Sequence, residues 1–218
     1  MISKKKKICL ASVLGASILT MGMLVGFSYQ VFAVEEVKIG VILPLSGPVA
    51  PIGETVRQGL DYGAAQVNEE GGIKSLGGAK IKLVYADSTG DPKVGMSEAE
   101  RLIVEEDVVA LMGAYQSSVT LTSTQVAERY RVPYVTVIAV SDAITERGFK
   151  YVFRVNETAG MTAEVIFKFM SEMGKATGEP VKTLGFLYEN TEWGQSSSKA
   201  WHKEAKEYGY KIGLDEPY

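Results

Sequence analysis

The fold is decided by one stretch, Val37-Lys-Ile-Gly-Val-Ile-Leu-Pro-Leu-Ser-Gly-Pro-Val-Ala-Pro-Ile-Gly53. Its first part, Val37–Leu43, is an apolar run of strand length, and the loop behind it opens a helix. A buried strand that runs into a helix is the unit of parallel sheets, which gather ligands at the carboxyl ends of their strands. Prolines at positions 44, 48 and 51 remove amide donors from this loop, so a nucleotide phosphate is not expected there.

An export signal precedes this stretch. Lys4–Lys7 form a basic start, Ile8–Phe27 are almost wholly apolar or small, and Val31-Phe32-Ala33 matches the small-x-small pattern of a cleavage site. We therefore expect residues 1–33 to be a signal peptide and the protein to act in the periplasm or at the outer face of the cytoplasmic membrane. The apolar run is also long enough to cross a bilayer, so a retained anchor is the alternative.

The net charge limits which partners the chain can bind, and the cysteine content limits its chemistry. The chain has 23 basic and 26 acidic residues, and removing the four signal lysines leaves 19 basic residues and a net charge of −7. This acidic balance argues against nucleic acid or an anionic membrane surface as a partner. The only cysteine, Cys9, lies within the signal, so the mature chain has no disulfide or thiol chemistry and depends on a packed core.

Strand and helix patterns alternate along the rest of the chain, which predicts an α/β fold with parallel sheets flanked by helices. The expected strands are Val37–Leu43, Lys80–Ala86, Val108–Met112, Pro133–Val140, Lys150–Val155, Thr183–Tyr188 and Tyr210–Leu214. The expected helices are Glu54–Glu69, one opened by Asp91-Pro92, Ser117–Arg129, one between Thr158 and Gly174, and Trp193–Tyr208. A change of unit near residue 155 divides the mature chain into a first lobe, residues 34–155, and the start of an incomplete second lobe, residues 156–218.

Helical spacing predicts which side chains face inward. Asp91 and the segment Asn156-Glu157-Thr158 are expected to cap the helices that follow them. The inward residues are expected to be Val56, Leu60, Ala64 and Val67 in the first helix, Val94, Ala99, Leu102 and Ile103 in the second, and Met161, Val165, Ile166, Phe169, Met170 and Met173 in the helix that ends before Gly174.

Catalytic and metal-binding patterns are absent from the sequence. The lone histidine, His202, lies among charged residues and is expected to be solvated, and without a second histidine or a mature cysteine there is no zinc ligand set. Asp87 and Asp91 lack the spacing of a calcium loop and are read as turn and cap residues. Neither a Gly-x-Ser-x-Gly elbow nor a Gly-x-Gly-x-x-Gly loop occurs, so we expect no enzyme activity and no cofactor, although a carboxylate-only active site stays open.

Several short motifs in a fixed order carry a family resemblance. Behind the signal and the Val37–Gly47 strand stand Asn68-Glu-Glu-Gly-Gly-Ile73, Asp87-x3-Asp91-Pro92, Gly113-Ala-Tyr-Gln-Ser-Ser118, Thr145-Glu-Arg-Gly-Phe-Lys-Tyr-Val-Phe-Arg154 and Tyr188-x4-Trp193-Gly194. In this order and spacing the chain resembles the extracytoplasmic solute-binding proteins of branched-chain amino acid ABC importers. The resemblance covers essentially all of the mature chain.

The resemblance implies a two-lobed clamshell of the periplasmic-binding-protein type with the ligand in the cleft. It implies a monomeric receptor that binds a small amino acid or related polar solute and delivers it to the membrane permease of an ABC importer. The segments that return to the first lobe and finish the second in such proteins are absent from these 218 residues. An extracytoplasmic sensing domain that signals to a membrane partner is the alternative.

The family's ligand-contacting positions fall first on the Gly113–Ser118 motif. Ser117 stands at the start of a helix, where a hydroxyl and unpaired amides favour a carboxylate, and Tyr115 and Ser118 are candidates beside it. Capping of its own helix by Ser117 or Ser118 is the alternative reading.

The second candidate segment is Ile138-Ala139-Val140-Ser141, where relatives present backbone groups and a hydroxyl to the ligand. Val140 stands where relatives have the hydroxyl, and Ser141 offers the nearest one. A buried strand end is the alternative for Ile138 and Val140.

Two apolar side chains complete the candidate site. Trp193, expected in the loop after Thr183–Tyr188, matches a position where relatives place an aromatic residue against the ligand, and an indole can cover a small molecule. Ile52 matches a position that lines the side-chain pocket, with packing of the loop against its helix as the alternative. Core packing is expected instead for Trp201.

Overall fold

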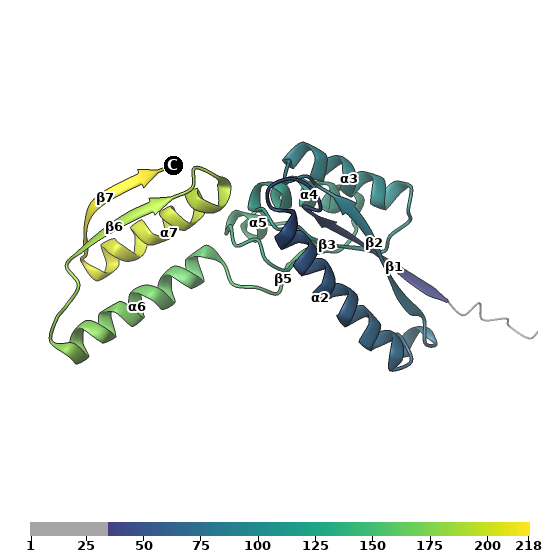
Figure 1. Ribbon diagram of the computed structural model, residues 1–218, viewed down its shortest axis with the longest axis horizontal. Helices are drawn as coiled ribbons and strands as arrows, with labels where there is room; N and C mark the ends of the chain where they lie inside the picture. Colours follow the sequence, from purple (N-terminus) through teal and green to yellow (C-terminus); the bar gives the residue numbers. More distant parts are fainter. Residues whose placement is uncertain (1–34) are drawn as a thin grey trace, which may run out of the picture. The chain divides into compact units, whose positions relative to one another are not determined.

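The computed structural model describes residues 35–218, and the predicted signal peptide lies outside the described residues (Figure 1). The described chain forms two parallel sheets flanked by helices, so the predicted α/β class is confirmed. Its elements are β1 (Glu36–Leu43), α2 (Ala50–Glu69), a 3₁₀ turn (Lys74–Leu76), β2 (Lys80–Asp87), α3 (Pro92–Val104), β3 (Ala110–Gly113), α4 (Ser117–Tyr130), β4 (Tyr134–Thr136), α5 (Ala143–Glu146), β5 (Val152–Arg154), α6 (Ala159–Thr177), β6 (Thr183–Tyr188), α7 (Glu192–Tyr208) and β7 (Lys211–Pro217). None of the helices within residues 35–218 is long and apolar enough to span a membrane.

The larger sheet has five parallel strands in the order β2-β1-β3-β4-β5. Strand β1 pairs on both sides, with Val41 opposite Tyr85 of β2 and opposite Met112 of β3. Because all five strands run in one direction, their carboxyl ends meet at one edge, which we call the carboxyl edge. The loops that follow β1, β3, β4 and β5 all leave the sheet there.

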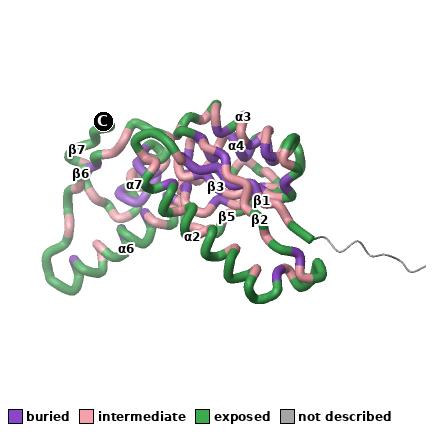
Figure 2. Tube along the Cα trace, turned by 45° about the vertical axis from the view of Figure 1, so that its right-hand side comes forward, coloured by how far each residue is buried: buried purple, intermediate pink, exposed green. Residues whose placement is uncertain are grey.

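The core of this sheet lies between β1, β3 and the helices α3 and α4, where the trace is coloured as buried in Figure 2. Ile42, Leu102, Leu111 and Val119 are fully buried, as is Tyr134. The Ser123 hydroxyl donates a hydrogen bond to the Tyr134 oxygen over 3.1 Å, and burial raises the pKa of that phenol. The expected inward face of α3 is confirmed, because Ala99 and Leu102 are buried with Val94 and Ile103 beside them.

The predicted caps are present. Asp91 accepts hydrogen bonds from the amides of Lys93 and Val94 over 2.6 and 3.3 Å and begins α3. Thr158 accepts one from the Met161 amide over 3.1 Å and begins α6. These side chains satisfy amides that have no partner within their own helices, which fixes where the helices start.

Three strands of the larger sheet are shorter than predicted, and the one expected at Lys150–Val155 is only Val152–Arg154. The strand expected at Pro133–Val140 is only Tyr134–Thr136, and the one expected at Val108–Met112 is Ala110–Gly113. After Thr136 the chain leaves the ladder, and its backbone carbonyls bond to side chains instead of to a neighbouring strand. Ile138, Ala139 and Val140 therefore lie in a loop, so their reading as a strand end is wrong.

The predicted inward face of α6 is also wrong, except at Met170, which is partly buried and packs against the core of the smaller sheet. Met161, Val165, Ile166, Phe169 and Met173 are between 44 and 67% exposed, and α6 is largely coloured as exposed in Figure 2. The buried residues are Ala159, Ala163 and Phe167 with Gly174. Ala159, Ala163 and Phe167 form an i, i+4, i+8 stripe that packs on α7. Because small residues let two helices approach closely, this narrow stripe is enough for the contact. The helix also continues beyond Gly174 to Thr177, and Gly178 ends it in a left-handed conformation.

In the smaller sheet β6 pairs with β7 in parallel, and α7 packs against both strands. Its core joins Phe186 and Ala205 with Phe167 of α6, and Trp201 packs against it as predicted. The side chain of His202 is 38% exposed, its Nε2 lies 3.1 Å from an Asp215 carboxylate oxygen, and its ring contacts Phe186. The expectation of a solvated histidine is confirmed in part, and His202 also joins α7 to β7.

Helix α2 begins at Ala50, four residues earlier than expected from Glu54, with Pro51 in its first turn. Proline fits there because the first amides of a helix have no internal partner. Val56, Leu60 and Ala64 are partly buried as expected, but Val67 is 38% exposed. The buried residue of α2 is Gly53, where the helix passes against the loop that follows β1.

We predict opposite effects for two glycine-to-alanine substitutions in α2. A Cβ at Gly53 would lie 2.0 Å from the Pro44 carbonyl oxygen, so Gly53→Ala should lower the free energy of unfolding by about 1 to 3 kcal/mol. A Cβ at Gly59 meets no atom within 4 Å, so Gly59→Ala should raise it by about 0.5 to 1 kcal/mol through helix propensity. Urea denaturation of the two variants measures both signs, and a shift in the same direction would contradict this packing of α2.

Candidate functional site

The candidate site is built where β3 passes into α4. Gly113 ends β3 at φ +120°, and a Cβ there would lie 2.1 Å from the Ile42 carbonyl oxygen, so only glycine lets the loop pass so close to β1. Gln116 occupies the N-cap position of α4 without a side-chain cap. Within residues 35–218, the amides of Ser117, Ser118 and Val119 have no hydrogen-bond acceptor. The amino-terminal turn of α4 therefore presents free N–H groups, which favour an anionic partner.

Ser117 connects this turn to the loop that follows β4. Its side chain is buried, and its hydroxyl oxygen accepts a hydrogen bond from the Ser141 amide over 3.4 Å. No side chain caps α4, so the alternative in which Ser117 or Ser118 caps the helix is wrong. Ser118 and Tyr115 are partly buried beside it.

The backbone carbonyls of the loop Ile138–Ser141 are already engaged within the chain. The Asn156 amide nitrogen donates to the carbonyls of Ile138 and Ala139, over 3.1 and 3.2 Å. The Arg154 guanidinium donates to the carbonyls of Ala139 and Ser141, over 2.5 and 2.7 Å. The Ala159 amide donates a hydrogen bond to the Val140 carbonyl over 2.8 Å. These hydrogen bonds fix the loop. The Ser141 hydroxyl takes no part in them and is directed toward α7.

Sequence reasoning missed Arg154 and Asn156 as residues that position the site. Burial lowers the pKa of the Arg154 guanidinium, against the opposing effect of the nearby Asp142 carboxylate. A partly buried arginine is tolerated when its donors are satisfied, and here backbone carbonyls satisfy them. The signal that could have found the pair is the sequence Arg154-Val-Asn156 directly after a short strand, two long polar side chains where the chain must turn.

The first turns of α7 contact this loop through polar side chains. The Ser141 hydroxyl donates to a carboxylate oxygen of Glu192 over 2.8 Å. The Ser196 hydroxyl donates to the Asp142 carboxylate and accepts from the Asp142 amide, both over 3.3 Å. The Gly160 amide donates to the same carboxylate over 3.2 Å. Sequence reasoning missed Glu192 and Asp142, because only the three-dimensional arrangement brings them to Ser141.

Trp193 and Ile52 lie in first turns of helices. Trp193 lies in the first turn of α7 rather than in the preceding loop, and its side chain is 49% exposed. Ile52 lies in the first turn of α2, and its side chain is 41% exposed. Both side chains therefore retain apolar surface that a ligand could cover.

Buried polar atoms without partners gather at the carboxyl edge. Within residues 35–218, the buried side-chain oxygens that lack a hydrogen-bond partner are Gln116 Oε1, Thr136 Oγ1 and Asn156 Oδ1. These residues follow β3, end β4 and follow β5, respectively. Such atoms are rare in folded proteins, and each one calls for an explanation. Their concentration at one edge, beside the free amides of α4, marks this edge as the polar site of the described chain.

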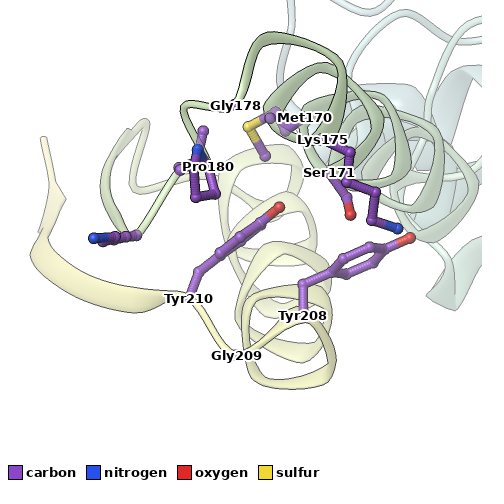
Figure 3. A pocket seen from close by; sticks show the side chains of 11 residues that line it. Met170, Ser171, Lys175, Gly178, Pro180, Tyr208, Gly209 and Tyr210 are labelled. Carbon is purple, nitrogen blue, oxygen red and sulfur yellow. The ribbon is translucent and has the colours of Figure 1, made fainter.

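A cavity of about 460 Å³ lies away from this edge (Figure 3). It is lined by the carboxyl-terminal ends of α6 and α7 and the loop before β6, with Tyr208 and Tyr210 stacked at a centroid separation of 5.9 Å. Lys175 and Lys182 also line it. None of the residues expected to bind ligand lines it. Residues 35–218 also hold no group of three or more side chains arranged to bind a metal ion.

Parallel α/β sheets take up ligands at the carboxyl ends of their strands, and the polar carboxyl edge of this chain is of that kind. The chain belongs to the periplasmic binding protein family, whose model matches residues 36–218. Members of this family are binding proteins rather than enzymes, and they act outside the cytoplasm.

The relatives include proteins of the branched-chain amino acid type. The chain is 33% identical over 189 residues to Leu/Ile/Val-binding protein homolog 7 of Brucella abortus, covering 85% of this chain and 46% of that protein. It is 34% identical over 199 residues to homolog 8 of the same organism, covering 89% of this chain and 48% of that protein. The chain spans about half the length of the curated relatives it matches.

Solved structures share the fold. An ABC transporter substrate-binding protein from Desulfitobacterium hafniense in complex with Leu superposes with a TM-score of 0.72 at 22% identity, covering 84% of this chain and 51% of that one. A solute-binding protein from Rhodopseudomonas palustris in complex with 4-hydroxybenzoate superposes with a TM-score of 0.70 at 25% identity, covering 84% and 47%. The predicted family resemblance is confirmed.

Asp87 holds the loop that joins β1 to α2, the helix that carries Ile52. Its carboxylate accepts hydrogen bonds from the amides of Leu45 and Thr89, both over 2.8 Å, and from Ser46 over 3.3 Å. Burial alone would raise its pKa, but these bonds together with one from the Ser46 hydroxyl outweigh it and hold the pKa below its usual value. The reading of Asp87 as a turn residue is confirmed.

We predict that Asp87→Asn destabilises the protein in a pH-dependent way. A carboxylate with a depressed pKa contributes stability above its unfolded-state pKa and loses it as pH falls through the folded-state value. The variant should lose about 1 to 2 kcal/mol of unfolding free energy at pH 7, and the difference from wild type should shrink below about pH 4. Urea denaturation between pH 7 and 3 measures this. Asp107→Asn, at an exposed carboxylate that accepts no hydrogen bond within the described chain, is the control and should show no such trend.

Proposed function

We propose that the protein is an extracytoplasmic receptor that binds a small amino acid or related carboxylate and delivers it to the permease of an ABC importer. Residues 34–155 form the first lobe in this proposal, residues 156–218 belong to the second, and the receptor acts as a monomer. The observation that carries the proposal is the free amino-terminal turn of α4 beside the buried Ser117 hydroxyl.

A carboxylate fits this turn for electrostatic reasons. The amides of Ser117, Ser118 and Val119 need acceptors, and the partial positive charge of the helix terminus favours an anion. Ser117 adds a hydroxyl that can donate to a carboxylate while it accepts from the Ser141 amide. The ligands named for related structures support this chemistry, because Leu, isoleucine and 4-hydroxybenzoate all carry a carboxylate.

The apolar part of the ligand would contact Trp193 and Ile52. Trp193 follows Glu192, whose carboxylate accepts from Ser141, and its half-exposed indole retains apolar surface for a ligand. Closure of the lobes around a ligand is a shift toward a conformation that the ligand prefers, and it contributes only as much as the difference in affinity between the two states.

A thermal-shift screen tests this function. We expect one class among L-amino acids, amino acid amides, short peptides and aromatic acids to raise the melting temperature of the complete chain in a concentration-dependent way, because a ligand that binds only the folded state stabilises it. Ser117→Ala should weaken that binding by about 1 to 3 kcal/mol through loss of a hydrogen bond to a charged group. Ser97→Ala, at an exposed serine of α3, should bind as wild type. No stabilisation by any member of the panel would count against the receptor function.

We also predict that Trp193 reports ligand binding. The chain has two tryptophans, and Trp201 packs in the core against Phe186 with a centroid separation of 5.5 Å. Solute binding should change the intrinsic fluorescence because the indole of Trp193 becomes covered. Trp193→Phe should abolish most of this change, whereas Trp201→Phe should keep it. A response that follows Trp201 instead would remove Trp193 from the site.

A further inference from the structure

We propose that the side-chain amide of Gln116 hydrogen-bonds the side chain of the ligand, so that the receptor prefers a polar amino acid to a hydrocarbon one of the same shape. This inference rests on the proposed receptor function and names the class of side chain that the ligand carries. It comes from an amide that stands at the carboxyl edge without a partner in the described chain.

The hydrogen bonds of Gln116 involve its backbone only. Its carbonyl accepts from the amide and from the hydroxyl of Thr120, both over 3.0 Å. Within residues 35–218, the side-chain amide of Gln116 forms no hydrogen bond, and its Oε1 is buried. A buried amide oxygen without a donor costs free energy, so a partner from outside these residues is expected to supply one.

Gln116 also stands where helix stability favours a different residue. It occupies the N-cap position of α4 in an extended conformation, and its side chain does not cap the helix. Serine, threonine, aspartate and asparagine are preferred at this position because their short side chains reach the first amides of the helix. A residue that departs from such a local preference without a gain in stability is expected at functional sites.

The loop between β2 and α3 holds the Gln116 amide in place without bonding to it. Gly90 of this loop has φ +80°, and a Cβ there would lie 2.7 Å from Gln116 Nε2. The amide therefore packs against the backbone at Gly90, which limits the positions that it can take. An amide confined in this way loses little conformational freedom when it binds a ligand.

The Gln116 amide belongs to the residue beside the proposed carboxylate site. Gln116 directly precedes the free amides of Ser117, Ser118 and Val119. In an α-amino acid the side chain is attached to the carbon atom that carries the carboxylate. A ligand whose carboxylate binds at the α4 terminus therefore holds its own side chain close to this turn.

Two further oxygens at the same edge also lack donors. Thr136 Oγ1 is buried at the end of β4, and Asn156 Oδ1 is buried after β5. The nitrogen of Asn156 donates to the carbonyls of Ile138, Ala139 and Glu157, which fixes its oxygen as the free end of the amide. An amide oxygen can only accept, so this edge holds acceptors that the aliphatic side chain of a ligand cannot satisfy.

Selectivity follows from the cost of leaving polar groups of a site unpaired. A ligand side chain with N–H or O–H groups forms new hydrogen bonds with these acceptors, whereas a hydrocarbon side chain excludes water and provides none. A site built to bond a hydroxyl or an amide rejects the analogue that lacks it far more strongly than an apolar pocket rejects an added or missing methylene.

The test uses pairs of L-amino acids that have nearly the same shape and differ in polarity: asparagine with leucine, threonine with valine, and glutamine with methionine. Titration calorimetry on the complete chain measures their affinities. For the pair whose size fits the site, wild type should bind the polar member at least tenfold more tightly. Gln116→Met, which keeps the length of the side chain and removes the amide, should weaken binding of the polar member by about 10- to 100-fold. It should leave binding of the apolar member unchanged or make it tighter.

Gln125→Met is the matched control, because Gln125 is an exposed glutamine of the same helix. It should leave every affinity unchanged. Thermal melts without ligand separate a ligand contact from a structural role. Gln116→Met should melt at the temperature of wild type or above it, since the substitution removes a buried oxygen that has no donor. A large fall in its melting temperature would assign the amide to the stability of the fold instead.

The outcomes distinguish this inference from the function on which it rests. If wild type binds leucine, valine or methionine as tightly as the polar counterpart, the inference is overturned and the receptor function stands. The same holds if Gln116→Met binds the polar member as wild type does. If wild type binds no member of any pair but another acid or amide of the thermal-shift panel stabilises it, only the inference fails. If nothing in that panel binds, both fail.

Discussion

The structure depends on the pairing of β1 with parallel strands on both sides. This pairing places the carboxyl ends of β2, β1 and β3 at one edge, and β4 and β5 extend the same edge. It also requires close approach, because a Cβ at Gly40 would lie 2.7 Å from the Leu111 side chain and one at Gly113 would meet the backbone of β1. Small residues at these points bring the start of α4 near enough to the loop after β4 for Ser117 and Ser141 to bond.

Beyond the end of β4, hydrogen bonds from side chains replace the backbone hydrogen bonds of the sheet. Strand β4 has three residues, and the chain beyond it holds its shape through Arg154 and Asn156 rather than through a ladder. Each of these side chains bonds to two carbonyls of the loop, so together they replace the missing strand partner. A loop fixed in this way is rigid enough to direct one hydroxyl, that of Ser141, and such preorganisation lowers the entropic cost of binding a ligand.

Much of the fold follows from sequence patterns, and the exceptions have physical causes. The order of strands and helices is readable because apolar runs of strand length alternate with caps such as Asp91. The face of α6 is not readable from periodicity, because two apolar faces compete and the helix packs through the narrower one at Ala159 and Ala163. The early end of β4 also cannot be read from the sequence. Ile138 and Val140 have strand-forming side chains, and only the contacts of their carbonyls with the Asn156 side chain and the Ala159 amide take them out of the sheet.

Some residues of the candidate site can likewise be predicted from the sequence, and others cannot. Ser117 can be named from sequence because a serine at the start of a helix after a buried strand has few roles, and the family resemblance selects among them. Glu192 cannot, because its neighbours in sequence are ordinary residues at a helix start and its significance arises from a partner 51 positions away. Burying polar groups without partners costs stability, and a protein selected for stability alone would pair the amides of α4 and the oxygens of Gln116, Thr136 and Asn156. Their concentration at one edge, beside the free amides of α4, is the arrangement expected if the carboxyl edge takes up a ligand, as we propose.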